Sequence, residues 1–162
     1  MLTVREATPD DYDDIARLTV ASFRALPRWV GDEYGKHLAD VAVRVGSGGV
    51  VLVAEQGEAL IGSVTLVLDE GPLFDFDYGT DGDCSFRMLA TDPAAWGSGA
   101  GPALVGECIR RARAAGRKQM AIASTEWMTT AHRIYERFGF RRRPDLDPTW
   151  DDICGVAFVL EL

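Results

Sequence analysis

Residues 96–101, with the sequence Trp-Gly-Ser-Gly-Ala-Gly, lie just beyond Asp92-Pro93 and directly before an apolar stretch with helical spacing. Glycines at alternate positions let a backbone approach a ligand closely, because no Cβ atom intervenes. The helix that follows would direct its unpaired N–H groups and the positive end of its dipole to the same place. The run therefore favours a site for an anionic, phosphate-bearing ligand. A glycine-rich turn that only caps the helix is the alternative.

The spacing within the run separates known classes of phosphate-binding loop. A dinucleotide-binding loop needs Gly-x-Gly-x-x-Gly early in a β-α-β unit, with an acidic residue about 20 positions later. Here Gly101 comes one position too early, and Arg117-Lys118 occupies the region of that acid. A nucleoside-triphosphatase loop would continue with Gly-Lys-Ser/Thr, which does not follow the run. The spacing thus disfavours both classes.

Composition bounds the kind of protein. The 162 residues are 47% hydrophobic and 26% charged, which is enough for one buried core, so a single domain over residues 1–162 is expected. No stretch approaches the roughly 18 apolar residues of a membrane span, and residues 1–6 lack the apolar segment of a signal peptide. A cytoplasmic protein without a membrane partner is therefore expected. The formal net charge of −8 disfavours a nucleic-acid partner.

Charge and cysteine positions add further expectations. Seven acidic residues lie between positions 69 and 92, in a segment that is either a solvated loop or an attraction for a polycationic amine. Ten of the 17 basic residues lie between Arg110 and Arg143, and they form a solvated helix face or include a few that meet distal phosphates. The widely spaced cysteines Cys84, Cys108 and Cys154 are expected to be reduced and packed.

Hydrophobic periodicity and turn residues predict the order of the elements. A strand over 2–6 precedes a helix that begins at Thr8-Pro9 and ends by Pro27, and a second helix covers 32–45. Strands over 50–55 and 59–68 form a hairpin, and a loop over 69–83 leads to a strand over 85–91, which enters the glycine run. Beyond the next helix, the pattern predicts a strand over 117–124, a helix over 129–138 and a strand over 153–160.

The glycine run and a second segment, residues 131–140 with the sequence Ala-His-Arg-Ile-Tyr-Glu-Arg-Phe-Gly-Phe, together resemble the GCN5-related N-acetyltransferase (GNAT) family. In that family a strand ends in a Val-x-Pro-like segment, Arg/Gln-x-x-Gly-x-Gly/Ala opens a helix, and a later helix carries Ala-x-x-Leu-Tyr-x-Lys-x-Gly-Phe. Residues 91–93, 96–101 and 131–140 hold these positions in the same order, and the resemblance covers nearly the whole chain. It implies an α/β fold of three-layer α+β type, with a mixed, mostly antiparallel sheet of about six to seven strands flanked by about four helices.

Three residues depart from the family pattern. Trp96 stands where the family has Arg or Gln, Met128 where many members have Asn, and Pro102 follows the last glycine. Trp96 in place of Arg or Gln removes one phosphate contact. Pro102 removes one N–H donor, although proline is tolerated in the first turn of a helix. The Trp96 side chain either covers the helix start or stacks on part of the cofactor.

The resemblance implies an acetyl-CoA-dependent N-acetyltransferase that passes an acetyl group to a primary amine of a small molecule or peptide by direct attack. A catalytically silent acyl-CoA-binding or interaction domain with the same fold is the alternative, and the resemblance allows a homodimer. Acetyl-CoA is the expected cosubstrate; no metal is expected, because no His, Asp or Glu cluster has metal-ligand spacing. A backbone N–H near Leu89 or Ala90 would stabilise the oxyanion. The expected cofactor-binding residues are Leu89, Ala90, Thr91, Trp96, Gly97, Ser98, Gly99, Ala100 and Gly101.

Two side chains are candidates for proton transfer. Tyr135, with a pKa near 10, can donate to a leaving thiolate whose conjugate acid has a pKa of about 8.5, although its place in an apolar helical stripe also fits core packing. An ammonium acceptor must lose a proton, which Glu126 or a water relayed by backbone carbonyls would take; an exposed loop glutamate is the alternative. His37 and His132 are interpreted as surface or satisfied residues.

The resemblance places the acceptor pocket at the first two helices and the loop between them. Arg87, inside an otherwise apolar strand, either faces a carboxylate of the substrate or points to solvent. Packing in the core would explain some of the apolar residues of this region equally well. The residues expected near the pocket mouth are Phe23, Leu26, Trp29 and Tyr34, with Phe23, Trp29 and Tyr34 as the substrate-binding set.

Overall fold

The computed structural model describes residues 1–69, 71–73, 83–150 and 152–162 of the chain. One mixed sheet crosses the molecule in the order β1-β2-β3-β4-β5-β8-β6, and β7 pairs with β8 outside this path. Among the described pairings, only β4 with β5 is parallel. The strands are β1 (Leu2–Glu6), β2 (Val50–Gln56), β3 (Ala59–Val67), β4 (Asp83–Thr91), β5 (Gln119–Thr125), β6 (Arg141–Arg142), β7 (Thr149–Trp150) and β8 (Ile153–Glu161).

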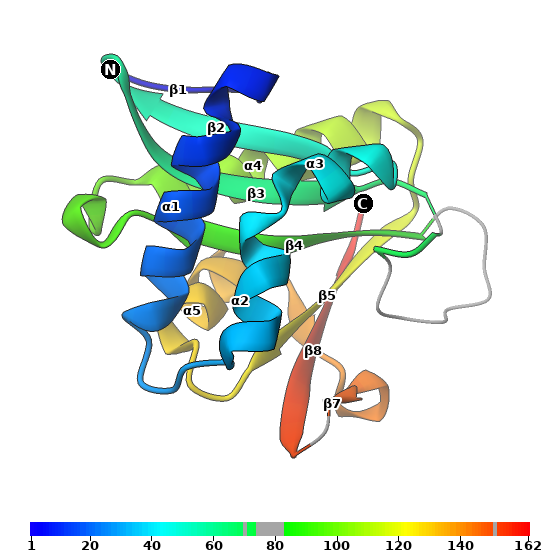
Figure 1. Ribbon diagram of the computed structural model, residues 1–162. Helices are drawn as coiled ribbons and strands as arrows, with labels where there is room; N and C mark the ends of the chain where they lie inside the picture. The colour runs from blue at the N-terminus through cyan, green and yellow to red at the C-terminus, as the bar shows by residue number, and fades with distance from the viewer. Residues whose placement is uncertain (70, 74–82, 151) are drawn as a thin grey trace.

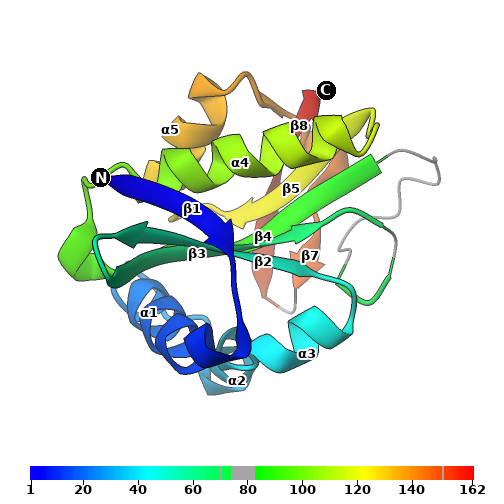
Figure 2. The ribbon, with the colours of Figure 1, turned by 90° about the horizontal axis from the view of Figure 1, so that it is seen from above.

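Helices cover both faces of this sheet (Figures 1 and 2). On one face lie α1 (Tyr12–Arg24), α2 (Asp32–Ala39) and α3 (Val41–Gly46), and on the other lie α4 (Ala100–Ala114) and α5 (Thr129–Arg137). The short 3-10 turns are η1 (Pro9–Asp11), η2 (Pro93–Ala95) and η3 (Pro144–Leu146). The predicted three-layer, mostly antiparallel fold is confirmed, with eight strands and five α-helices among the described residues.

Apolar side chains fill the space on each side of the sheet. The larger cluster lies between the sheet and the layer of α4 and α5, and includes the fully buried Leu52, Val64 and Leu104. A second cluster joins α1 and α2 to β4 through Leu18 and Leu38. Burying each such side chain is worth about 1.5–3 kcal/mol, so both helical layers are held firmly against β3 and β4.

The predicted single helix over 32–45 is wrong, because the chain breaks between α2 and α3 at Asp40. The backbone of Asp40 leaves the helical region, with ψ 72°, and its carboxylate accepts a hydrogen bond from the Val43 N–H at 3.2 Å. Asp40 is thus the N-cap of a new helix. Apolar periodicity does not reveal the break, since Leu38 and Val41 are both buried across it.

The expectation for the cysteines is correct at two positions and wrong at the third. Cys84 and Cys108 are buried, whereas Cys154 is exposed, because it lies in the short β7–β8 pairing opposite Thr149. The predicted loop over 69–83 falls mostly outside the described residues, and Asp83 itself belongs to β4. Within the described part of the chain, every helix is too short or too polar to cross a membrane.

Candidate active site

The sheet splits between β4 and β5. The two strands pair only at their first residues, Asp83 with Gln119 and Cys84 with Met120, and then diverge toward their carboxyl ends (Figure 1). A cavity of about 250 Å³ occupies this split. Strands β4, β5, β7 and β8 and both helical layers contribute to its lining. The lining residues are Phe23, Val30, Tyr34, Phe86, Arg87, Met88, Leu89, Ala123, Ser124, Thr125, Met128, Ala131, Tyr135, Trp150 and Ile153.

A β-bulge shapes the β4 wall of the cavity. Met88 and Leu89 together lie opposite the single residue Val64 of β3, and Met88 has a φ of 56°. A positive φ is rare for a residue other than glycine, and bulges of this kind re-aim side chains beside functional sites. Both Met88 and Leu89 line the cavity, and the backbone of Leu89 has no partner in the register with β3.

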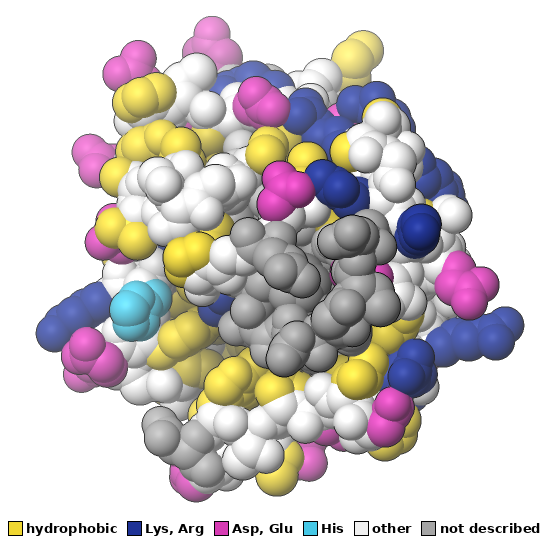
Figure 3. Space-filling model, turned by 90° about the vertical axis from the view of Figure 1, so that its right-hand side faces the viewer, with side chains coloured by type: hydrophobic (Ala, Val, Ile, Leu, Met, Phe, Trp, Pro, Cys, Tyr) yellow, Lys and Arg dark blue, Asp and Glu magenta, His cyan; other side chains and the backbone are white. Residues whose placement is uncertain are grey.

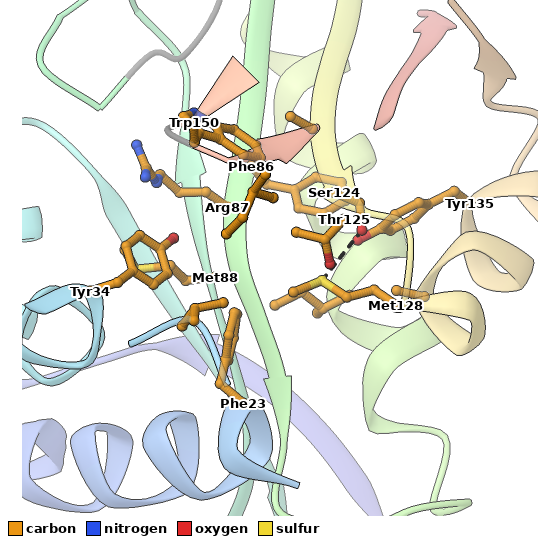
Figure 4. A pocket seen from close by; sticks show the side chains of 15 residues that line it. Phe23, Tyr34, Phe86, Arg87, Met88, Ser124, Thr125, Met128, Tyr135 and Trp150 are labelled. Carbon is orange, nitrogen blue, oxygen red and sulfur yellow. Dashed lines mark hydrogen bonds between the residues drawn. The ribbon is translucent and has the colours of Figure 1, made fainter. Parts of the chain in front are cut away.

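The cavity is mostly apolar with few polar groups. Figure 4 shows Phe23 and Tyr34 approaching it from the layer of α1 and α2, opposite Met128 and Tyr135 on the side of α5. Such a lining is typical of a small-molecule site, in which a few placed polar groups orient the ligand.

Tyr135 is both a core residue and a wall of the cavity. Its side chain is only 5% exposed and packs within 5.5–5.8 Å of the rings of Phe86, Phe140 and Phe158. Its ring extends from α5 toward Ser124 (Figure 4). Burial raises the pKa of the Tyr135 phenol above its usual value of 10, so the hydroxyl carries its proton at neutral pH.

The glycine run connects η2 to α4 and presents free backbone donors. Gly97 and Gly99 have φ values of 86° and 91°, which favour glycine, and α4 begins at Ala100. In the described part of the chain, the N–H groups of Gly97, Gly99 and Gly101 donate to no backbone or side-chain acceptor. The Ser98 N–H, by contrast, donates to the Ala95 carbonyl at 3.1 Å. Three donors at a helix start fit an anionic group.

The residues that depart from the family pattern each have a defined place. The Trp96 side chain is 55% exposed, and its indole Nε1 donates to the Thr91 carbonyl at 3.1 Å, which fixes the ring across the end of β4. Pro102 lies in the first turn of α4 and is partly buried. The Met128 side chain lines the cavity, and its sulfur lies 3.3 Å from the Ser124 hydroxyl, within reach of that group as an acceptor.

Some of the other predicted site residues line the cavity, and others lie outside its lining. Phe23, Tyr34 and Leu89 line it, while Ala90 and Thr91 pair with β3 at its edge. Trp29 lies outside the lining: its Nε1 donates to Asp32 at 3.1 Å, and the Arg24 guanidinium stacks over its ring. Glu126 is exposed and also lies outside the lining. Arg87 lines the cavity and donates to the Leu73 carbonyl at 2.9 Å.

Sequence reasoning missed three polar or aromatic contributors. His132 lies 3.1 Å from the Ser124 hydroxyl, so the residue interpreted as satisfied is hydrogen-bonded to the cavity wall. The Thr125 hydroxyl is buried on the same wall without a partner in the described residues. Trp150 of β7 also lines the cavity, which only tertiary structure reveals.

Arginines in α4 and in the segment that follows it form ion pairs on the surface. Arg111 pairs with Glu6 at 2.6 Å, and Arg117 pairs with Asp69 at 2.6 Å. Figure 3 shows basic side chains gathered on one side of the face it presents. These pairs favour the solvated-face interpretation of the basic half. Among the described residues, no group of three or more His, Cys, Asp or Glu side chains could hold a metal ion.

Solved structures with this fold cover nearly the whole chain. YncA of Salmonella typhimurium, solved with acetyl-CoA, has a TM-score of 0.72 and 20% identity, over 99% of this chain and 94% of that chain. A GNAT-family acetyltransferase from Staphylococcus aureus Mu50 has a TM-score of 0.77 and 13% identity, over 100% and 99%. PaiA N-acetyltransferase from Thermoplasma acidophilum, solved with coenzyme A, has a TM-score of 0.72 and 14% identity, over 97% and 98%. No curated protein sequence matches the chain.

The chain therefore shares its fold with these acetyltransferases. The sequence model of the acetyltransferase (GNAT) family matches residues 12–140, and the chain belongs to that family. The resemblance seen in the glycine run and in residues 131–140 is thereby confirmed.

Proposed function

We propose that this chain, as one domain over residues 1–162, is an acetyl-CoA-dependent N-acetyltransferase that acts on a primary amine of a small molecule or peptide by direct attack. The observation that carries the proposal is the cavity between β4 and β5, which has Tyr135 on its wall and lies where β4 leads into the glycine run. Family membership supports acyl transfer, and the acetyl-CoA and coenzyme A held by two structural neighbours support the donor.

The glycine run and β4 fit the two parts of this donor. The free N–H groups of Gly97, Gly99 and Gly101 would hold the pyrophosphate, with the dipole of α4 behind them. Beyond Cys84, the β4 edge that faces β5 is unpaired in the described residues, so an extended amide chain can pair with it as a strand would. A backbone N–H near Leu89 would then donate to the oxyanion, a contact typically worth about 2.7–4 kcal/mol.

Tyr135 would supply the proton that the leaving sulfur needs. The amine nitrogen bonds to the thioester carbonyl carbon, the carbon–sulfur bond breaks, and the Tyr135 phenol donates to the sulfur. Burial raises the pKa of this phenol, but the same apolar surroundings destabilise a thiolate. The developing thiolate is therefore a stronger base in the cavity than in water, and the transfer remains favourable.

The acceptor would enter from the layer of α1 and α2. Phe23, Val30 and Tyr34 line this side of the cavity, and Met88 continues the apolar surface from β4. These contacts favour an amine carried on an apolar group. A cavity of about 250 Å³ accommodates a small molecule or the end of a peptide.

The full chain should be incubated with acetyl-CoA and a panel of primary amines, with release of free thiol and the mass of the product as readouts. Tyr135→Phe should lower the rate about 100-fold or more, because general acid catalysis contributes at least that much, while coenzyme A affinity stays nearly unchanged. Tyr12→Phe is the matched control, since Tyr12 packs against the α1 side of the sheet and lies outside the cavity lining.

Binding by calorimetry separates the alternatives. The proposal expects stabilisation by acetyl-CoA and coenzyme A. Tight acetyl-CoA binding without acetylation of any amine would point to a silent acyl-CoA-binding domain. Stabilisation by NAD alone would contradict the proposal.

A further inference from the structure

Ser124 and His132 form a hydrogen-bonded pair behind the cavity wall. Ser124 is near the end of β5, is 4% exposed and lines the cavity, and its Oγ lies 3.1 Å from Nε2 of His132 on α5. The His132 ring packs 5.1 Å from the Phe158 ring and 6.4 Å from the Tyr135 ring. The pair thus adjoins the proposed general acid, and the half-buried imidazole joins the cavity wall to the protein surface.

The Ser124 hydroxyl has one proton and two acceptors within reach. One is the imidazole Nε2, and the other is the sulfur of Met128 at 3.3 Å. A thioether sulfur is a weak acceptor, whereas the unprotonated nitrogen of a neutral imidazole is a strong one. When His132 is neutral and carries its proton on Nδ1, the hydroxyl proton therefore favours Nε2. The serine oxygen then keeps its lone pairs for a donor in the cavity.

The surroundings of His132 favour its neutral form. Burial lowers the pKa of the imidazole below its usual value of 6.5, and the nearby Arg142 guanidinium acts in the same direction. Glu136 and a hydrogen bond to the Thr125 backbone act in the opposite direction but do not reverse the shift. Tyr135 next to it carries no charge at neutral pH. His132 is thus mostly unprotonated at pH 7 and can accept a proton.

We propose that Ser124 and His132 form a proton relay that removes the first proton from the ammonium group of the acceptor. This inference rests on the proposed function and supplies the base that the sequence did not identify. Ser124 Oγ takes a proton from the ammonium nitrogen while its own proton passes to Nε2 of His132, so that a neutral amine and an imidazolium result.

The remaining protons balance at the other side of the cavity. As the carbon–nitrogen bond forms and the carbon–sulfur bond breaks, Tyr135 gives its proton to the sulfur and recovers one from the nitrogen. The imidazolium of His132 releases its proton to water. The products are the amide, the free thiol and one proton, and every side chain returns to its starting state.

The first test measures the titration of His132 by NMR, and needs no substrate. The chain has only two histidines, and His37→Gln leaves the His132 resonances alone in the spectrum. His132 should titrate below pH 6.5. Ser124→Ala should move the midpoint upward, because a donated hydrogen bond to Nε2 stabilises the neutral ring. A midpoint at or above 6.5 in the wild type, or a downward shift in the variant, would overturn the relay.

The second test compares two acceptors of similar shape, an alkyl amine that is protonated at pH 7 and an aryl amine that is neutral. His132→Gln and Ser124→Ala should slow acetylation of the alkyl amine about 100-fold or more, and should slow the aryl amine much less, because the latter has no first proton to lose. In the wild type, kcat/KM for the alkyl amine should decrease as the pH is lowered through the titration midpoint of His132. The control His37→Gln should retain the wild-type rates, since His37 is exposed on α2.

The outcomes separate this inference from the proposed function. If no amine is acetylated while acetyl-CoA binds, the proposed function fails. The NMR titration alone then decides whether Ser124 donates a hydrogen bond to a neutral His132. Equal slowing of both amines would assign His132 a merely structural role and contradict the relay. A mass increase of one acetyl group on Ser124 after incubation with acetyl-CoA alone would replace the relay by a nucleophilic serine.

Discussion

Gly101 at the start of α4 lies directly against Ile134 of α5, so closely that a Cβ atom at position 101 would be 2.9 Å from the Ile134 Cδ1 atom. The glycine run and the helix that carries Tyr135 therefore touch at this point. Gly101→Ala should displace the flexible Cδ1 end of the Ile134 side chain, and it should change the free energy of unfolding by less than about 1 kcal/mol. It should weaken coenzyme A binding and slow catalysis, because the displaced side chain lies between the glycine run and the helix of Tyr135; calorimetry and the amine assay would measure both effects.

A matched control is available on the same helix. A Cβ at Gly106 would meet the Phe138 ring at 3.6 Å, an ordinary contact. Gly106→Ala should be neutral or stabilising, by up to about 1 kcal/mol, because alanine favours the helix. If the two variants behave alike in stability and in binding, the contact with Ile134 does not position the site.

The backbone conformation of the glycine run is expected to control donor affinity. Gly99 has a φ of 91°, so Gly99→Ala should strain the loop and turn its N–H groups away, which weakens coenzyme A binding about tenfold or more. Gly57→Ala, at φ 64° in the β2–β3 turn, introduces comparable strain away from the site. Calorimetric titration of both variants should show reduced affinity only for Gly99→Ala. Equal affinities would mean that these N–H groups do not hold the pyrophosphate.

Local patterns predicted most of the fold, and the failures have physical causes. The strand over 2–6 and the hairpin strands followed from alternation and turn residues, because those elements depend on nearby residues. The break at Asp40 was missed because Leu38 and Val41 keep one buried face across it. The split of the sheet and the positive φ of Met88 arise where β3, β4 and β5 meet, so no single segment of sequence contains them.

In the candidate site, too, the sequence predicted the parts that lie within short segments and missed those that depend on long-range contacts. Tyr135 and the glycine run carry motifs within short segments, and the structure places both beside β4. Their chemical roles stay predictions. The contact between Ser124 and His132 depends on how α5 packs on β5, and Trp150 lines the cavity from β7. Long-range contacts of this kind leave no periodic trace in the sequence.

Asp11 should make the stability of the fold depend on acid pH. Its carboxylate accepts from Arg5 at 2.8 Å and from the Thr8 N–H at 2.7 Å, and these partners lower its pKa from 3.8 to about 2. A lowered pKa stabilises the folded state above pH 3.8, and this contribution is lost as the pH falls toward 2. Because Arg5 is 38% exposed and solvent screens the pair, a contribution of about 1–2 kcal/mol is expected.

Urea unfolding at several pH values would measure this contribution. Asp11→Asn should be less stable than the wild type at pH 6, and the difference should shrink between pH 3.8 and pH 2. Asp10→Asn removes the same charge from an exposed side chain of the same turn, so its effect on stability should be smaller. If the difference in free energy of unfolding between wild type and Asp11→Asn stays constant with pH, the ionised Asp11 carboxylate does not stabilise the fold.

Arg44 should hold α2, and with it Tyr34, against the sheet. The side chain is 3% exposed; its Nη1 donates to the carbonyls of His37 and Leu38 at 2.8 and 3.0 Å, and its Nε donates to Thr65 of β3 at 3.1 Å. Burial lowers its pKa to about 10, so it still carries its charge at neutral pH. These bonds satisfy carbonyls in the last turn of α2, where the chain breaks before α3 and where a cation interacts favourably with the helix dipole.

Arg44→Leu leaves those carbonyls and the Thr65 hydroxyl without the guanidinium, and should lower the free energy of unfolding by about 2–4 kcal/mol in urea. Arg44→Lys keeps the charge but offers a single donor nitrogen, so its loss should be intermediate. Arg113→Leu, on the exposed face of α4, should change stability by less than about 0.5 kcal/mol. Since α2 carries Tyr34 to the cavity, Arg44→Leu should also raise KM for the acceptor more than that for acetyl-CoA. An Arg44→Leu variant as stable as Arg113→Leu would show that α2 is held by its apolar face alone.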